Sequence, residues 1–109
     1  MIVNDDTVSK ALHYLATDPH PIALARKDVT DAENALEFYE ADHYLEAEGT
    51  LKERESQVIT SEGYATLRAA LSEATLELER HKARMRAAEM LIEVWRSEQA
   101  NVRAAERVR

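Results

Sequence analysis

The chain has 109 residues, enough for one compact domain, and its 45% hydrophobic and 32% charged content is typical of a folded protein. Only two glycines and two prolines are present, which excludes a sandwich or barrel with many tight turns. The absence of cysteine excludes disulfides, thiol nucleophiles and thiolate metal sites. No apolar run approaches the ~18 residues that cross a bilayer, and the polar start is unlike a signal peptide, so we expect a soluble, cytoplasmic protein with no membrane partner.

The net charge of −7 is unevenly distributed along the chain. Residues 1–79 hold 17 acidic and 6 basic residues, whereas residues 80–109 hold 4 acidic and 8 basic residues. The first part would repel nucleic acids and anionic membranes, and the last part could attract them. The structural alternative is an acidic body whose last helix carries bases at its C-terminal end, where they suit the helix dipole.

The pattern of apolar residues predicts four helices in a single domain, over residues 6–17, 22–48, 50–60 and 62–106, and no strand. Asp5 or Asp6 is the expected N-cap of the first helix, because a carboxylate accepts the unpaired N–H groups of the first turn. The apolar face of this helix carries Val8, Leu12 and Leu15. The two prolines of the segment Asp18-Pro19-His20-Pro21 should end it.

The second predicted helix has apolar positions at alternating spacings of three and four, which indicates a coiled-coil seam. These positions are Ile22, Ala25, Val29, Ala32, Leu36, Tyr39 and His43. The other faces are acidic, and Phe38 and Leu45 lie off the seam, where we expect another surface, such as the first helix, to cover them. Gly49 suits the left-handed residue that ends a helix.

The third predicted helix begins with a capping box, in which Thr50 and Glu53 satisfy each other's backbone N–H groups. Ser61 is the expected N-cap of the last helix, with Glu62 in its first turn. Gly63 is predicted to be a mild defect there, costing about 1 kcal/mol relative to alanine.

The last predicted helix carries the longest regular pattern in the sequence, with spacings of three and four from Tyr64 to Glu106. Its seam positions are Tyr64, Leu67, Leu71, Ala74, Leu78, His81, Met85, Ala88, Ile92, Trp95, Gln99, Val102 and Glu106. Such a helix would be about 70 Å long, against about 40 Å for the second helix. A hairpin of the two therefore leaves part of the seam without a partner.

A second copy of the chain is the simplest cover for that remainder, because most soluble oligomers are homo-oligomers. The first helix could instead fold onto it, and fraying of the last ten residues is a further alternative. The predicted fold is therefore all-α: an antiparallel helical hairpin or coiled coil with a long C-terminal helix and a short N-terminal helix, assembled as a homodimer. A strict monomer would indicate a three-helix bundle.

His43 and His81 fall on seam positions, with Glu40 and Glu77 near them on their own helices. Glu40 and His43 have the Glu-x-x-His spacing of di-iron four-helix proteins, but those proteins need a second such pair, which this sequence lacks. A dimer could supply ligands by symmetry, yet the expectation is ordinary seam histidines and no metal.

The sequence contains no nucleophile elbow and no glycine-rich phosphate loop. A small helical hairpin also offers little dry, concave space for catalysis. We therefore expect a protein that is not an enzyme and needs no cofactor.

Trp95, the single tryptophan, lies on the seam and is expected either to pack in the core or dimer contact, or to anchor a binding partner. Lys82, Arg96 and Arg103 are seven or fourteen residues apart and form one basic stripe beside the seam, which Glu89 interrupts. Together with Arg107, these are the candidate partner-binding or nucleic-acid-binding residues.

The segments Glu48–Glu55, Ser61–Tyr64 and Ala88–Ser97, with Ala100, Asn101 and Arg103, resemble a family of small helical proteins encoded by tailed bacteriophages and prophages. The resemblance covers the chain from Ala11 onward, and its most specific part is the string IEVWRSEQAN. It implies an early phage gene product in a bacterial host cell, near recombination or replication genes, and brings no catalytic residues with it.

Two functions from different classes follow from these observations. The first is an interaction protein that docks on a phage or host protein and modulates recombination, replication or a host defence complex; mimicry of DNA by the acidic second helix is a variant of it. The alternative is an accessory factor that binds nucleic acid through Lys82, Arg96, Arg103 and Arg107 on the paired tails of a dimer, with affinity that falls steeply with salt.

Overall fold

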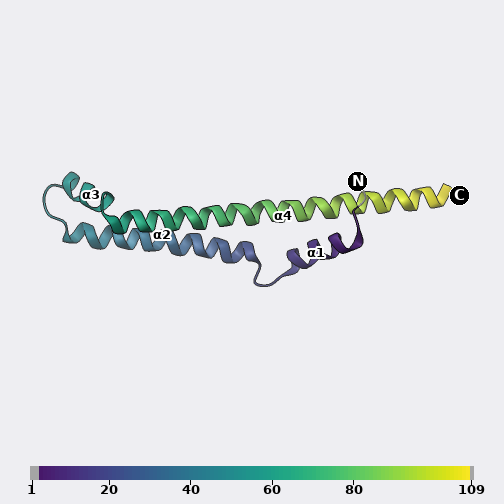
Figure 1. The fold of residues 1–109 in the computed structure, drawn as a ribbon, viewed down its shortest axis with the longest axis horizontal. Coiled ribbons are helices and arrows are strands. Elements are labelled where there is room, and N and C mark those ends of the chain that lie inside the picture. The colour runs from purple at the N-terminus through teal and green to yellow at the C-terminus, as the bar shows by residue number, and fades with distance from the viewer. Residues whose placement is uncertain (1–2, 109) are drawn as a thin grey trace. The chain divides into compact units, whose positions relative to one another are not determined.

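The computed structural model describes residues 3–108, and within that range every regular element is a helix (Figure 1). The helices are α1 (Asp5–Ala16), α2 (Pro21–Glu46), α3 (Leu51–Ile59) and α4 (Glu62–Val108). The all-α class, the four helices and the long C-terminal helix are therefore confirmed. α4 is a single helix of 47 residues, so the long seam is not interrupted by a break.

The chain divides into two compact units, and α4 contributes to both. Unit 1 consists of residues 1–22 and 80–109, and therefore contains α1 and the second part of α4. Unit 2 consists of residues 23–79, and contains most of α2, all of α3 and the first part of α4. Each unit is described separately below.

α1 is capped by Asn4 and not by Asp5 or Asp6, so the predicted cap is wrong by one or two positions. The Asn4 side-chain oxygen accepts the Thr7 N–H at 2.8 Å, and Asp5 and Asp6 occupy the first turn. The reason is that an asparagine oxygen caps as well as a carboxylate, while the two acids then lie where the positive end of the helix dipole favours them. The predicted boundary at the two prolines is confirmed: α1 ends at Ala16, and α2 begins at Pro21.

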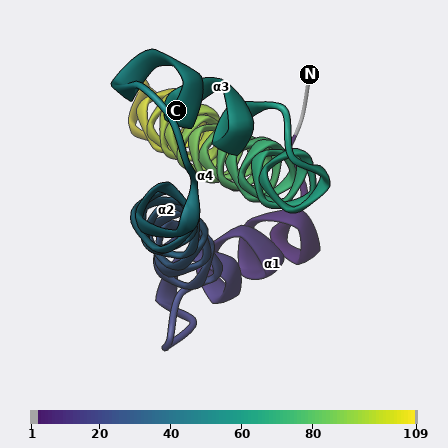
Figure 2. The ribbon, with the colours of Figure 1, turned by 90° about the vertical axis from the view of Figure 1, so that its left-hand side faces the viewer.

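In unit 2, α2 and the first part of α4 lie side by side and antiparallel, joined through α3 (Figures 1 and 2). The predicted seam positions are the ones that this packing shields. In α2 these are Val29, Ala32, Leu36, Tyr39 and His43; in α4 they are Tyr64, Leu67, Leu71, Ala74 and Leu78. All of them are buried or half-buried, which confirms the alternating pattern in both helices.

Gly63 is a packing requirement and not the mild defect that the sequence predicted. A Cβ atom added at this position would lie 2.5–2.8 Å from three atoms of the Tyr39 ring and hydroxyl, closer than real Cβ contacts allow. Tyr39 is held there because its hydroxyl shares a 2.7 Å hydrogen bond with Ser61 Oγ. The glycine therefore lets the start of α4 approach α2 closely.

The chain between α2 and α4 follows the predicted capping signals. Gly49 has a φ of 110°, and the capping box of Thr50 and Glu53 is present at the start of α3. Ser61 caps α4 by accepting the Tyr64 N–H, and its own hydroxyl donates to the Val58 carbonyl. Because Val58 itself is buried, α3 is attached by an apolar side chain as well as by its caps.

In unit 1, α1 lies antiparallel to the second part of α4. Tyr14 contacts His81, Ala11 and Ala88 share one buried cluster, and Asp5 bonds to Trp95, so positions run in opposite directions along the two helices. The predicted apolar face of α1 is partly wrong. Leu12 is 52% exposed, and the buried face is formed by Val8, Ala11 and Tyr14, because small residues allow the two helices to approach closely.

α1 thereby covers a stretch of seam for which the sequence favoured a second copy of the chain. All seam positions from His81 to Gln99 are buried or half-buried, and Val3 extends the contact by donating its N–H to Glu98 at 2.9 Å. Val102 and Glu106 are exposed. The seam without cover in unit 1 is therefore its last stretch, after Gln99.

The predicted cover over Phe38 and Leu45 is wrong. Their exposed fractions are 74% and 80%, and α1, the helix proposed to shield them, packs within unit 1.

No side chain among residues 3–108 is completely shielded from solvent, because pairs of helices bury only one face of each member. Within this described range, none of the helices combines the length and apolar content that a membrane span requires.

Candidate functional site

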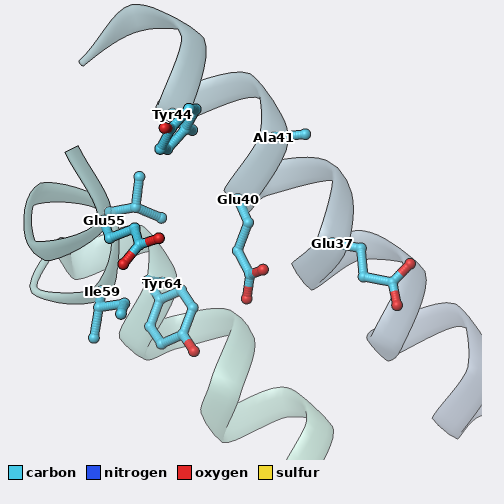
Figure 3. A pocket seen from close by; sticks show the side chains of 8 residues that line it. Glu37, Glu40, Ala41, Tyr44, Glu55, Ile59 and Tyr64 are labelled. Atoms are coloured by element: carbon cyan, nitrogen blue, oxygen red, sulfur yellow. The ribbon is translucent and has the colours of Figure 1, made fainter. Parts of the chain in front are cut away.

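Unit 2 contains a hollow of about 490 Å³ between α2, α3 and the start of α4 (Figure 3). Its apolar wall is formed by residues from all three helices: Ala41, Tyr44, Val58, Ile59 and Tyr64. Three carboxylate side chains complete the lining, Glu37 and Glu40 from α2 and Glu55 from α3. An apolar wall with acidic groups around it suits a ligand that is both apolar and cationic.

The local sequence explains why the hollow forms. Gly49 and the capping box turn the chain into α3, whose residues Val58 and Ile59 line the hollow together with residues of α2. The Ala41 side chain points away from α3, so this residue lines the hollow from the α2 side (Figure 3). The Arg54 guanidinium lies 5.9 Å from the centre of the Tyr44 ring, which places one cation against this aromatic wall.

Phe38 and Leu45 extend the apolar surface beyond the hollow. They are seven residues apart on α2, and Ala41 lies between them at three and four residues. At helical spacing these three positions share one side of α2. Because Ala41 also lines the hollow, the outer side of α2 and the hollow form one apolar surface, which we call the docking face: Phe38, Ala41, Leu45 and the hollow's lining residues.

Glu40 and His43, the two residues with the Glu-x-x-His spacing, have different neighbours: Glu40 lines the hollow, while His43 lies beside Asp42 and Glu46. Among residues 3–108, these last three form the group whose ligand atoms lie close enough for a metal, within 4.8 Å of one another. His43 stacks on Tyr39 with ring centres 3.8 Å apart, and its Nδ1 lies 3.1 Å from the Tyr39 carbonyl oxygen. His43 therefore has a packing role on the seam.

His81, the other predicted seam histidine, belongs to unit 1 and helps to fix α1. The Tyr14 hydroxyl donates to the His81 carbonyl at 3.3 Å and lies 3.5 Å from its Nδ1. The Arg84 guanidinium lies over the Tyr14 ring, 4.5 Å from its centre. These contacts account for the burial of Tyr14, a residue that the sequence pattern did not single out.

Trp95 and Arg96, the predicted contact residues, are held within unit 1. The Trp95 indole N–H donates to Asp5 Oδ1 at 3.3 Å, and the ring is half-buried. The Arg96 guanidinium bonds to Glu93 on the next turn at 3.0 Å and is exposed. Trp95 therefore fastens the start of α1 to α4, while Arg96 faces solvent.

The other candidate basic residues, Lys82, Arg103 and Arg107, are also exposed on α4 in unit 1. Arg103 donates from Nε to the Gln99 carbonyl oxygen at 3.4 Å. The structure thus places all five candidates in unit 1, four of them on the solvent side, and gathers none of them at the hollow of unit 2.

The sequence pattern missed the hollow but contained one signal for the docking face. Phe38 and Leu45 interrupt the acidic faces of α2 off the seam, which marks a second apolar side of this helix. Residues of α3 form the opposite wall, and their position depends on the turn geometry that a periodicity analysis does not provide.

Comparison with known proteins adds no family: no family model matches the chain, and no curated protein or solved structure is detectably similar to it.

Proposed function

We propose that this protein is a non-enzymatic interaction protein that binds another protein through the docking face of unit 2. The observation that carries the proposal is the exposure of Phe38 and Leu45, which are 74% and 80% accessible on one side of α2 beside an apolar hollow. Single exposed apolar residues are common, whereas a phenylalanine and a leucine that continue into a hollow indicate a surface for association.

The thin core of the unit supports the same proposal. α2 and α4 form a pair that shields only the seam, and a further helix on the outer side of α2 would add a second apolar layer. Aromatic residues at interfaces supply much of the binding energy, and the docking face offers Phe38, Tyr44 and Tyr64.

The biological setting of this proposal comes from the sequence resemblance alone. A small helical protein of the phage type would act in the cytoplasm of a bacterial host, on a phage or host protein of recombination, replication or defence. Modulation by binding requires no catalytic residue in the small protein itself.

The experiment is site-specific photo-crosslinking in the bacterial host cell, with a photoreactive phenylalanine analogue at position 38. We expect a discrete covalent adduct with a cellular protein. Excess unlabelled wild-type protein should suppress the adduct, and excess Phe38→Ser/Leu45→Ser protein should not.

The matched control carries the same analogue at Leu12, an exposed apolar residue of α1 in unit 1. No adduct from position 38, or the same adduct from both positions, would contradict binding through the docking face.

A second candidate function is nucleic-acid binding, which the exposure of Lys82, Arg96, Arg103 and Arg107 favours. In this hypothesis the uncovered seam at Val102 pairs the tails of two copies and doubles the number of phosphate contacts. Light scattering should then give the mass of a dimer, and Val102→Asp should give that of a monomer. Fluorescence titration with single- and double-stranded oligonucleotides should show affinity that falls steeply with salt; absence of binding at low salt would exclude this function.

A further inference from the structure

We infer that the partner of the docking face is a basic amphipathic helix, which places apolar side chains on Phe38, Ala41 and Leu45 and directs Lys or Arg toward the carboxylates around the hollow. This inference rests on the proposed function and adds the chemistry of the partner. It follows from three observations: the charge around the face, the repulsion between copies, and the spacing of the apolar residues.

Acidic residues predominate around the docking face, although the Arg54 guanidinium lies near the Tyr44 ring in the wall of the hollow. Residues 28–51 contain eight acidic residues and no Lys or Arg, and unit 2 as a whole contains 14 acidic and 5 basic residues. Glu37, Glu40 and Glu55 line the hollow directly. A partner with negative charge, including a nucleic acid, would be repelled here, whereas a cationic partner is attracted before contact and in the complex.

The same charges disfavour a second copy of this chain on the face. A symmetric pair joined through Phe38 and Leu45 would bring each copy's acidic side of α2 against the other's, because a two-fold contact matches a surface with itself. Glu37, Asp42 and Glu46 flank the apolar side chains on this helix. Opposed carboxylates at an interface lower its affinity, so the apolar side is better matched by a cationic partner.

The spacing of the exposed residues fits a helix and not an extended strand. Phe38, Ala41 and Leu45 follow the three-and-four pattern by which one helix packs along another. A partner helix along α2 would place its own apolar positions at the same repeat and reach the hollow with one larger side chain. An extended peptide would instead need an open sheet edge, and residues 3–108 contain no strand.

The test uses designed peptides and the full-length protein. The cationic probe is an amidated 15-residue peptide of leucine and lysine, with leucine at helical spacing. A second peptide has glutamine in place of every lysine, and a third has the composition of the first in an order without an apolar face. Fluorescence anisotropy of labelled peptide measures binding at low and at high salt.

We expect the cationic amphipathic peptide to bind more tightly than either of the other two. The variant Glu37→Gln/Glu40→Gln/Glu55→Gln should bind it about tenfold more weakly, since three exposed charge contacts are lost. The variant Glu73→Gln/Glu77→Gln/Glu79→Gln removes the same number of charges from exposed positions of α4 in unit 2 that do not line the hollow. It should bind the peptide with nearly wild-type affinity.

The outcomes separate this inference from the proposed function. If the glutamine peptide bound as tightly as the lysine peptide, or if the two triple variants weakened binding equally, the inference of a basic partner would be overturned. The crosslinking experiment at position 38 would still test whether the docking face binds a protein. Equal binding of the reordered peptide would overturn the amphipathic helix. Absence of binding by all three peptides would also overturn the inference, whatever the crosslinking shows.

Discussion

α4 takes part in two antiparallel helix pairs, one in each unit, and the two pairs differ in charge and in length. Unit 1 contains nine basic and seven acidic residues, whereas unit 2 contains five basic and fourteen acidic residues. In unit 1 the partner is α1, with 12 residues; in unit 2 it is α2, with 26 residues. One continuous seam on α4 thus supports a nearly neutral pair and a strongly acidic pair.

The two pairs also differ in how the helices are held. In unit 1, small side chains at Ala11 and Ala88 let α1 approach closely, and polar groups fasten its ends, Asp5 to Trp95 and Tyr14 to His81. In unit 2 the pair is longer, and large apolar residues of α2 stay exposed on the outer side. Unit 1 also has exposed apolar side chains, because Leu12, Met90 and Val102 are 51–62% accessible. Phe38 and Leu45 of unit 2 are 74% and 80% accessible, and they lie on the side of α2 that adjoins the hollow.

Ala88→Leu should destabilise the protein strongly, because it breaks the close approach of α1 and α4 in unit 1. Ala88 is buried against Ala11 and Tyr14, and the added side-chain atoms must displace α1. We expect a loss of about 1–3 kcal/mol in the free energy of unfolding, measured by urea titration followed by circular dichroism. Ala83→Leu, the same change on an exposed side of α4, should leave the midpoint near wild type. Unchanged stability of Ala88→Leu would contradict the packing of α1 on α4.

Gly63→Ala should destabilise unit 2, although helix propensity alone would favour alanine by about 1 kcal/mol. The new Cβ atom would lie within 2.8 Å of the Tyr39 ring, and we expect a net loss of about 1–2 kcal/mol in the free energy of unfolding. In a Tyr39→Ala background the same substitution should become stabilising, which a double-mutant cycle would measure. Stabilisation in the wild-type background would show that the two helices do not approach closely at this position.

Much of this fold could be predicted from the sequence, because the strongest signals were local or periodic. The seam from Tyr64 to Gln99 repeats at the spacing of one helix face, and each of its positions proved to be shielded. Gly49, Thr50 and Ser61 each determine a turn or cap through their own backbone or side chain, so no distant contact was needed.

The errors arose where the outcome depends on a second element. Leu12 fits an apolar face of α1, yet contact with Ala88 favours the side with Ala11 and Tyr14, so that Leu12 stays exposed. The role of Gly63 depends on where Tyr39 lies, 24 positions earlier in the chain. The hollow needs walls from three helices, and the position of α3 relative to Ala41 is not encoded in any repeat.

Thr50→Ala should test how far the position of α3 in unit 2 depends on its cap. The Thr50 hydroxyl accepts the Glu53 N–H, and its loss should cost about 1 kcal/mol in the free energy of unfolding. Thr66→Ala is the matched control, because Thr66 lies within α4 and its hydroxyl only donates to the Glu62 carbonyl one turn earlier. Helix propensity predicts that this control is neutral or slightly stabilising. Equal losses in both variants would mean that the capping box adds nothing to α3.

The smallest stability effect is expected for Phe38→Ser and Leu45→Ser. Both side chains are already largely in water, and serine and phenylalanine have similar helix propensities, so each change should stay within about 0.5 kcal/mol. Leu36→Ala, on the covered side of the same helix, should cost about 2–5 kcal/mol in the same urea titration. If Phe38→Ser destabilised the protein as much as Leu36→Ala, the outer side of α2 would be covered by the chain itself. The contrast between the covered seam of α2 and its exposed outer side would then disappear, and with it the surface on which a partner is proposed to bind.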